Sequence, residues 1–173
     1  MTSYVLSDPH FTHANIIKFT RADGLPVRDF KSVEEMDSYM VERWNDTVAS
    51  NDTVYMLGDI VLNRRALPVL ERLNGHKVLI KGNHDIFKLK DYLPYFDDIR
   101  AYKIFHDHNV IMSHIPIHPG ELGGRFKYNI HGHLHERNVL HGGTQDPRYI
   151  NVCVEQIEYT PVSLEAIFCR LLP

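Results

Sequence analysis

The sequence predicts a mixed α/β sandwich in a single domain that spans residues 1–173. In the first half of the chain, short apolar segments alternate with segments of helical periodicity. In the second half, strand-like segments follow one another with short, glycine-containing connections. No internal repeat or long linker interrupts this order. Strands separated by helices, followed by strands separated by turns, are typical of a mixed α/β sandwich.

Seven segments have the apolar, β-branched and aromatic composition of strands. Thr53-Val-Tyr-Met-Leu57 is an example, because it is bounded by polar residues on one side and glycine on the other. The predicted strands cover residues 3–7, 53–57, 77–81, 99–105, 109–113, 127–131 and 149–154.

The clearest predicted helix runs from Ser32 to about Ala49. Ser32 and Glu35 form a capping-box pattern, and apolar residues then recur at roughly helical spacing. A second helix, Arg64–Leu73, ends at an Asn-Gly pair, which is a stop signal for helices. Shorter helices are expected directly after Asp85 and at residues 163–171.

Composition excludes several classes of protein. Hydrophobic residues make up 43% of the chain and charged residues 24%, which is ordinary for a globular domain. No apolar run approaches the roughly 20 residues that span a bilayer, so we expect no membrane partner. The first residues lack a basic region followed by a long apolar stretch, so we expect no signal peptide and a cytoplasmic location. We expect a monomer or a small homo-oligomer.

The charge balance also limits the partners. Lys and Arg total 19 and Asp and Glu total 22, so the formal net charge is −3. This balance argues against an extended surface for nucleic acid, but it leaves nucleotides and small phosphoesters as substrates. The two cysteines, Cys153 and Cys169, do not form a CxxC pair, and we expect both to be reduced. Any metal site must then use oxygen and imidazole ligands.

Residue types that bind cations follow five of the predicted strands. In an open α/β sheet, functional residues collect beyond the carboxyl ends of the strands. The chain has 12 histidines, and histidine is the commonest metal ligand. Glycines before several of these positions allow sharp turns and close approach of the backbone. The residues are Asp8 and His10, Asp59, Asn83 with His84 and Asp85, His114, and His133 with His135.

This ordered series resembles the calcineurin-like metallophosphoesterase superfamily. The motifs that carry the resemblance are Asp8-x-His10, Gly58-Asp59, Gly82-Asn83-His84-Asp85, His114 and Gly132-His133-x-His135. They extend from residue 8 to residue 135, which is most of the chain. The surrounding residues, including Asn151-Val-x-Val-Glu155, resemble a small bacterial and phage branch of phosphoesterases. The resemblance implies a calcineurin-like mixed β-sandwich flanked by helices, in the order α-β-β-α.

The resemblance also implies a centre of two divalent metal ions. Asp8, His10 and His135 would hold the first ion. Asn83, His114 and His133 would hold the second ion. Asp59 would bridge the two, His84 would act as general acid, and Asp85 would orient the His84 imidazole. Ligands of this kind favour Mn²⁺, and Fe, Ni²⁺ or Zn²⁺ also suit them.

The activity implied is hydrolysis of a phosphoester by a hydroxide that bridges the metals, with His84 as general acid. We expect a phosphodiesterase that acts on a small phosphodiester or nucleotide. The residues after Asp59 are not the Asp-Arg-Gly of Ser/Thr protein phosphatases, which disfavours a phosphoprotein substrate. Phosphomonoesterase or pyrophosphohydrolase activity is the alternative. A non-catalytic, metal-bound scaffold that binds a protein is the third hypothesis.

Three further residues are candidates for contact with the substrate: His13, Arg64 and His118. Each has a structural alternative. His13 fits a loop that leads into a short helix at 14–19, Arg64 fits a solvated helix face, and His118 fits the rim of the site. His131 lies two residues before a candidate ligand, and we expect it to be buried behind the site.

Overall fold

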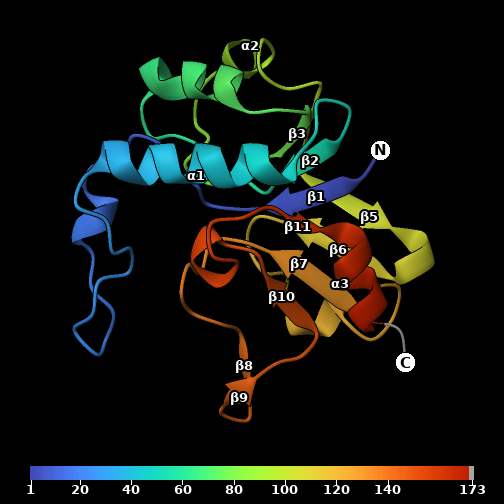
Figure 1. The fold of residues 1–173 in the computed structure, drawn as a ribbon. Helices are drawn as coiled ribbons and strands as arrows, with labels where there is room; N and C mark the ends of the chain where they lie inside the picture. Colours follow the sequence, from blue (N-terminus) through green and yellow to red (C-terminus); the bar gives the residue numbers. More distant parts are fainter. Residues whose placement is uncertain (172–173) are drawn as a thin grey trace.

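The computed structural model describes residues 1–171 and contains two mixed sheets. The first sheet has five strands in the order β11-β1-β2-β3-β4 (Figure 1). β1 to β4 run parallel, and β11 is antiparallel to β1. The strands are β1 (Ser3–Leu6), β2 (Thr53–Met56), β3 (His76–Ile80), β4 (Asp98–Arg100) and β11 (Val162–Ser163).

The second sheet has four strands in the order β10-β7-β6-β5. β10, β7 and β6 are parallel, whereas β5 is antiparallel to β6. The strands are β5 (Tyr102–Phe105), β6 (Val110–Ser113), β7 (Tyr128–His131) and β10 (Tyr149–Asn151). A separate hairpin, β8 (Leu140–His141) with β9 (Thr144–Gln145), projects away from both sheets (Figure 1).

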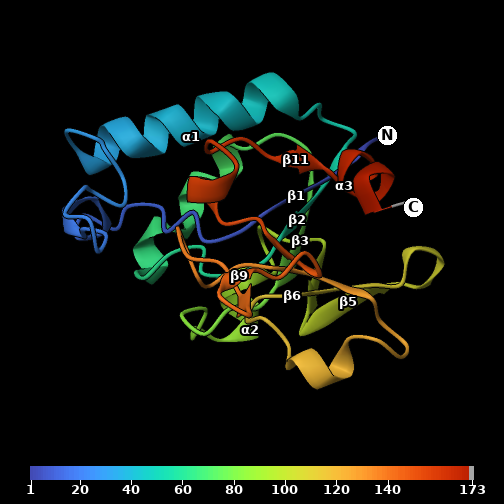
Figure 2. The ribbon, with the colours of Figure 1, turned by 90° about the horizontal axis from the view of Figure 1, so that it is seen from below.

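Helices cover the outer face of the first sheet. α1 (Val33–Thr47) lies along this face, as Figures 1 and 2 show, and η2 (Arg64–Arg72) and α2 (Leu89–Tyr92) lie beside it. Met40 and Trp44 of α1 belong to the same buried cluster as Val54 and Leu79 of the sheet. Burying these side chains fixes the helix against the strands.

A second hydrophobic core lies between the sheets. Val5 and Ile80 from the first sheet share this core with Met112 and Ile130 from the second, and all four are fully buried. α3 (Leu164–Leu171) adds Leu164 and Ile167. The opposite faces of the first sheet therefore pack against helices and against the second sheet.

Two helix predictions have different outcomes. The predicted helix at Ser32–Ala49 is confirmed as α1, since the Ser32 side chain accepts a hydrogen bond from the Glu35 amide and Glu35 accepts one from the Lys31 amide. The segment at 64–73 is a 3-10 helix instead of an α-helix. Pro68 lies in its middle, where it has no amide hydrogen for an α-helical bond.

The prediction of one strand at 99–105 is wrong. β4 ends at Arg100 in the first sheet, and β5 begins at Tyr102 in the second, so the chain changes sheets at Ala101. A run of strand-forming residues does not reveal such a change. The strand expected at 149–154 ends at Asn151 and continues into η5 (Val154–Gln156). Other short 3-10 turns are η1 (Ile16–Lys18), η3 (His106–His108) and η4 (Pro119–Glu121).

The expected order α-β-β-α is met on the side of the first sheet only. α3 contributes to the core between the sheets, and a loop at residues 115–127 lies over β7. β7 alternates Ile130, which faces the core, with the buried polar residues Asn129 and His131. The Asn129 side-chain oxygen accepts a hydrogen bond from the Ile117 backbone amide, and its nitrogen donates one to the Ser113 hydroxyl. Backbone and polar groups therefore cover this face of β7, which offers few apolar side chains for a helix to pack against.

Within residues 1–171, no helix combines the length and the apolar character needed to cross a membrane.

Ile130→Ala tests the core between the sheets. Ile130 is fully buried, so the truncation should lower the free energy of unfolding by about 2–5 kcal/mol. Urea denaturation measures this change. Ile115→Ala is the matched control, because Ile115 is 52% exposed and should change stability by less than about 0.5 kcal/mol. Equal effects of the two substitutions would contradict the assignment of this core.

Candidate metal centre

The candidate ligands meet at one edge of the sandwich. β1, β2 and β3 are parallel in one sheet, and β6 and β7 are parallel in the other, so their carboxyl ends point the same way within each sheet. A bridge between Ser7 and Cys153 joins the end of β1 to the segment after β10. Asp8 and Asp59 follow strands of the first sheet, and His114 and His133 follow strands of the second.

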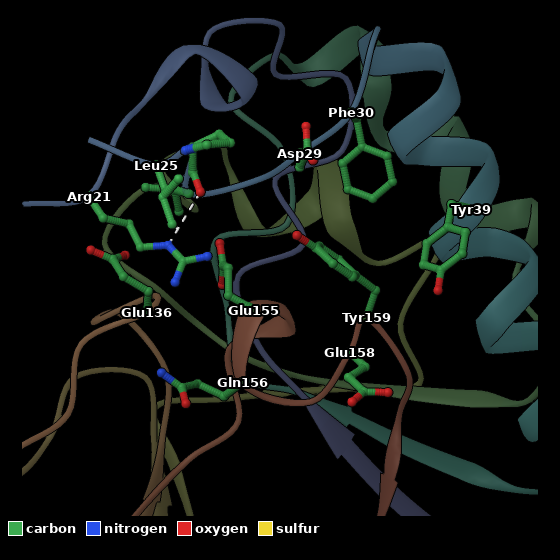
Figure 3. Close-up of a pocket in the computed structure, with 12 residues that line it drawn as sticks. Arg21, Leu25, Asp29, Phe30, Tyr39, Glu136, Glu155, Gln156, Glu158 and Tyr159 are labelled. Carbon is green, nitrogen blue, oxygen red and sulfur yellow. Dashed lines mark hydrogen bonds between the residues drawn. The ribbon is translucent and has the colours of Figure 1, made fainter. Parts of the chain in front are cut away.

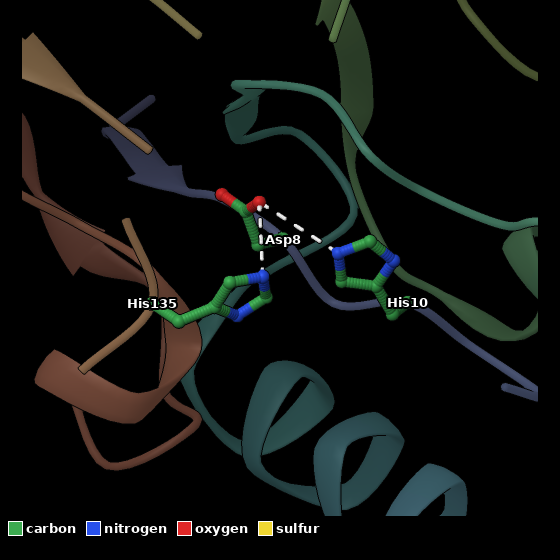
Figure 4. Close-up of side chains that lie close together, drawn as sticks. All are labelled: Asp8, His10 and His135. Atoms are coloured by element: carbon green, nitrogen blue, oxygen red, sulfur yellow. Dashed lines mark ion pairs between the residues drawn. The ribbon is translucent and has the colours of Figure 1, made fainter. Parts of the chain in front are cut away.

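The first candidate group consists of Asp8, His10 and His135, whose ligand atoms lie within 4.8 Å of one another. Asp8 Oδ1 is 3.7 Å from His10 Nε2 and 3.9 Å from His135 Nε2. Figure 4 shows both imidazoles with a ring nitrogen turned toward this carboxylate oxygen. The separations are too long for direct hydrogen bonds and leave room for a cation between the three atoms.

The two oxygens of Asp8 have different surroundings. Oδ2 accepts hydrogen bonds from the Ser7 hydroxyl, the His133 amide and the Cys153 thiol. Oδ1 is buried and has no hydrogen-bond partner, and neither do the two ring nitrogens of His10. A buried carboxylate oxygen without a partner costs free energy that a bound cation would recover.

The second candidate group consists of Asp59, His114 and His133, again with ligand atoms within 4.8 Å. Asn83 joins it, since its Oδ1 lies 2.8 Å from His114 Nε2. His114 Nδ1 is 2.6 Å from the Leu57 carbonyl oxygen, which can only accept a hydrogen bond, so the ring donates through Nδ1. In the neutral ring, Nε2 then carries a lone pair that faces the group, as a metal ligand requires.

Asp59 belongs to the second group and also lies close to the first. Its Oδ2 is 3.8 Å from His10 Nε2 of the first group and 3.4 Å from His114 Nε2 of the second. Its Oδ1 accepts the backbone amide of His84 at 2.8 Å. One carboxylate is therefore fixed within reach of both groups.

A buried ion pair supports the first group, and sequence reasoning gave it no role. Glu155 Oε1 is 2.9 Å from His135 Nδ1 and also accepts the Arg28 guanidinium at 2.7 Å. Arg28 is 1% exposed and donates to the backbone carbonyl oxygens of Asp8 and Pro9. Glu155 ends a stretch that resembled the family, whereas Arg28 lies in a loop with no motif that would have identified it.

Five candidate ligands adopt left-handed backbone conformations. The φ angles lie between 48° and 69°, in a region that non-glycine residues rarely occupy. Such strain, of order 1–3 kcal/mol per residue, persists where the surrounding structure enforces it. The residues are Asp8, His10, Asp59, His133 and His135. All five lie in the loops that follow β1, β2 and β7.

Two glycines allow these carboxylates to approach the backbone. A Cβ atom at Gly82 would overlap with the Asp59 carboxylate and its amide nitrogen. A Cβ atom at Gly132 would overlap with the Ser7 side chain and the Asp8 carboxylate. At both positions the contact, and not a special φ angle, requires glycine.

Neighbouring charges and hydrogen bonds shift the pKa values of the carboxylates and histidines in the site. Burial alone would raise the pKa values of Asp8 and Asp59, but the neighbouring histidines and hydrogen bonds lower both. Burial alone would lower the pKa values of His114 and His135, but the carboxylates of Asp59 and Glu155 raise them. The pKa of His133 is lowered by burial and by the charge of His114. The acids thus stay ionised, ready to hold cations.

The residues present fit two divalent cations. Each group offers one carboxylate and two imidazoles, and the second adds the Asn83 amide oxygen. The unpartnered buried atoms of Asp8 and His10 face the interior of the first group. Neither group includes a thiolate, which suits Mn²⁺, Fe, Ni²⁺ or Zn²⁺.

His84 lies beside the candidate ligands without belonging to either group. It is exposed, and its ring centroid is 5.9 Å from that of His10.

The expected role of Asp85 differs from what the structure shows. The Asp85 carboxylate is buried and accepts the backbone amides of Asp59, Ile60 and Gly82. Within residues 1–171 no hydrogen bond joins it to the His84 ring, so it holds two loops together instead.

The three residues predicted to contact the substrate have separate fates. The His13 ring centroid is 6.0 Å from that of His10, so His13 borders the first group. Arg64 forms an ion pair with Asp91 at 3.5 Å. His118 caps η4, accepting the Gly120 amide through Nδ1. Arg64 and His118 thus have local contacts of their own, and their contact with the substrate stays a prediction.

His131 is fully buried, and its Nδ1 lies 2.8 Å from the Gly132 carbonyl oxygen. The expectation of a buried position is confirmed. Burial lowers the pKa of this histidine.

Comparisons with known proteins identify relatives over almost the whole chain. The chain is 38% identical over 170 residues to the uncharacterized protein MJ1445 of Methanocaldococcus jannaschii, covering 95% of this chain and 88% of that protein. It is 26% identical to the Gene 66 protein of Mycobacterium phage D29, covering 84% of each. The crystal structure of AQ665, a protein of unknown function from Aquifex aeolicus, matches 99% of each chain with a TM-score of 0.73 and 28% identity. No protein-family model matches the chain.

Arg28→Met should destabilise the fold, because it leaves the Glu155 carboxylate buried without its guanidinium partner. Removing one member of a buried pair typically costs about 3–5 kcal/mol, which urea denaturation of the metal-free protein would measure. Arg64→Met removes an arginine whose side chain is 65% exposed and should leave the denaturation midpoint nearly unchanged. A small loss for Arg28→Met would show that the buried pair is dispensable.

Metal binding should release protons and weaken as the pH falls. His114 and His135 donate through Nδ1, so the proton that titrates is the one on Nε2. Their raised pKa values favour this proton in the metal-free protein, and a cation must displace it. Mn²⁺ affinity should therefore decline as the pH falls through these raised pKa values. Calorimetric titrations at one pH, in buffers of low and high ionisation enthalpy, count the protons released, and equal heats would refute this prediction.

Proposed function

The chain belongs to the same family as the uncharacterized protein MJ1445 of Methanocaldococcus jannaschii, and we propose that it is a calcineurin-like metallophosphoesterase with two divalent metal ions. The proposed activity is hydrolysis of a small phosphodiester or nucleotide. The position of Asp59 is the observation that carries this proposal. Its Oδ2 lies within 3.8 Å of one imidazole from each candidate group, where a bridging carboxylate would lie.

The proposed ligands are Asp8, His10 and His135 for the first ion, and Asn83, His114 and His133 for the second, with Asp59 shared. Two cations held in this way would supply Lewis acidity and an activated water for attack on phosphorus. The protein's own contribution is positional. Asp85 fixes the loops that carry Asp59 and Asn83, and Glu155 orients the His135 ring.

We propose His84 as the general acid. Its backbone amide is anchored to Asp59 Oδ1, which holds the residue at the site, while its side chain stays exposed to an incoming substrate. A proton donated from this imidazole to the departing oxygen would stabilise the leaving group. His13, whose ring centroid is 6.0 Å from that of His10, is a candidate for contact with the substrate. Burial, together with the charges of His10 and other neighbouring groups, lowers its pKa.

A cavity beside the first group supports a small substrate. It measures 560 Å³ and is lined by His135 together with Ile16, Phe19 and Arg137, among others. This volume lies within the range of small-molecule sites. The size of the cavity does not separate a diester from a monoester or a pyrophosphate, so these remain the alternative substrates. A metal-bound scaffold without activity is the competing hypothesis.

Activity measurements on substitutions test the proposal. With Mn²⁺, the protein should hydrolyse bis-p-nitrophenyl phosphate faster than p-nitrophenyl phosphate. His84→Ala should retain metal and lose about 10²–10⁴-fold in kcat, since general acid catalysis contributes that much. Asp59→Ala should lose both metal and activity. Two metal ions bound by Asp59→Ala, measured by elemental analysis, would exclude its bridging role.

His141→Ala is the matched control, because His141 is an exposed histidine in the separate β8–β9 hairpin. It should leave kcat and metal content unchanged. Absence of hydrolysis across cyclic nucleotides, dinucleotides, nucleotide sugars and both nitrophenyl esters would favour the scaffold hypothesis.

A further inference from the structure

A cavity of 710 Å³ is lined in part by Glu155, the residue that contacts the candidate metal ligand His135. Figure 3 shows its walls, which come from the loop at residues 21–30, from α1 and from the turn at residues 155–159. None of the proposed metal ligands lines it.

The cavity has an excess of negative charge. Asp29, Glu136, Glu155 and Glu158 line it, whereas Arg21 is the one cationic residue of the lining and the buried Arg28 pairs with Glu155. Arg21 is exposed, and its Nε donates to the Pro26 carbonyl oxygen at 3.3 Å. In the part of the chain that the structure describes, ion pairs join neither Arg21 nor the carboxylates of Asp29, Glu136 and Glu158 to another residue. The potential in the cavity therefore favours a cation.

Glu155 is the observation that points to a ligand. Its side chain is 4% exposed, and Oε1 is engaged by Arg28 and His135. The other oxygen, Oε2, is buried without a hydrogen-bond partner. In Figure 3 the Glu155 carboxylate lies between Arg21 and Tyr159. Buried carboxylate oxygens in native proteins almost always have a donor, and Oε2 is enclosed by the protein, so a ligand in the cavity becomes its donor when a covering side chain moves aside.

Three aromatic rings form one wall of the cavity. The Phe30 centroid is 5.7 Å from that of Tyr39 and 5.2 Å from that of Tyr159, and the two tyrosine rings are 5.9 Å apart. Tyr159 meets both other rings edge to face. Aromatic faces beside carboxylates attract organic cations through the ring quadrupole as well as through charge. An organic cation also has an alkyl part that can pack against this wall.

We propose that this cavity binds a small organic cation, whose ammonium or guanidinium group donates to Glu155 and whose alkyl part packs against Phe30, Tyr39 and Tyr159. Glu155 Oε1 accepts a hydrogen bond from Nδ1 of the candidate metal ligand His135. A cation bound to Oε2 would therefore change the charge on the residue that orients the His135 ring. Binding of the cation and binding of metal at the first group are then linked, and each changes the affinity of the other by the same factor.

Calorimetric titration of the metal-free protein with agmatine tests the proposal. Agmatine carries a guanidinium and an ammonium group, and butylurea is an uncharged control of similar shape. Agmatine should bind and butylurea should not. The double variant Asp29→Asn/Glu158→Gln should weaken agmatine binding by about 3–10-fold, because it removes two charges from the wall. Phe30→Leu should weaken it by about 2–5-fold through loss of the aromatic face.

The matched control is Glu121→Gln/Glu165→Gln, which removes two exposed carboxylates outside this cavity. It should leave the affinity for agmatine unchanged. Failure of agmatine to bind at about 10 mM, equal binding of butylurea, or equal weakening by both double variants would overturn the proposal. These titrations need neither metal nor turnover, so they stand whether or not the protein hydrolyses phosphoesters.

Two sources could supply this cation, and the KM of an aminoalkyl phosphodiester distinguishes them. From either source, saturating agmatine should change the Mn²⁺ affinity of the protein, and an unchanged affinity would overturn the link between the two sites. At saturating Mn²⁺, agmatine should raise the KM of an aminoalkyl phosphodiester if the cation is part of the substrate, and leave it unchanged if the cation is a free amine.

Discussion

The Asp8 carboxylate is fully buried at the junction of the two sheets, and its two oxygens have different surroundings. Oδ2 is saturated by donors from Ser7, His133 and Cys153, which come from three different segments of the chain. Oδ1 has no hydrogen-bond partner and faces two imidazoles. A charge held in this way is tolerable only with compensation nearby, so the surrounding histidines and backbone are arranged around it.

Further buried polar groups surround this carboxylate and form hydrogen bonds with one another. Arg28 ties the backbone of Asp8 and Pro9 to Glu155, and Glu155 orients His135. The left-handed turns that carry the candidate ligands are held by the same kind of contact. Each strained residue costs free energy that the hydrogen bonds and the two hydrophobic cores must offset. Glu155 also faces the acidic cavity, so the metal centre and that cavity share one carboxylate.

Local patterns predicted the elements where one physical signal dominated. α1 followed from its capping box and its apolar spacing, and the strands before Asp8 and Asp59 followed from continuous apolar runs. The patterns failed where distant contacts decided the outcome. The segment at 99–105 is divided between two sheets, and β11, at residues 162–163, forms only because it can pair with β1. Short edge strands of this kind carry little signal of their own.

The sequence by itself determined which residue types follow each strand, and parallel strands bring such residues to one edge of a sheet. That was enough to nominate the candidate ligands between Asp8 and His135, and the family resemblance implied their division into two sets. Only the tertiary structure decided which residues support the candidate ligands, because these contacts join residues far apart in the chain. Asp85 accepts a hydrogen bond from the Asp59 amide, and Arg28 donates one to Glu155. Their partners depend on packing and leave no periodic pattern in the sequence.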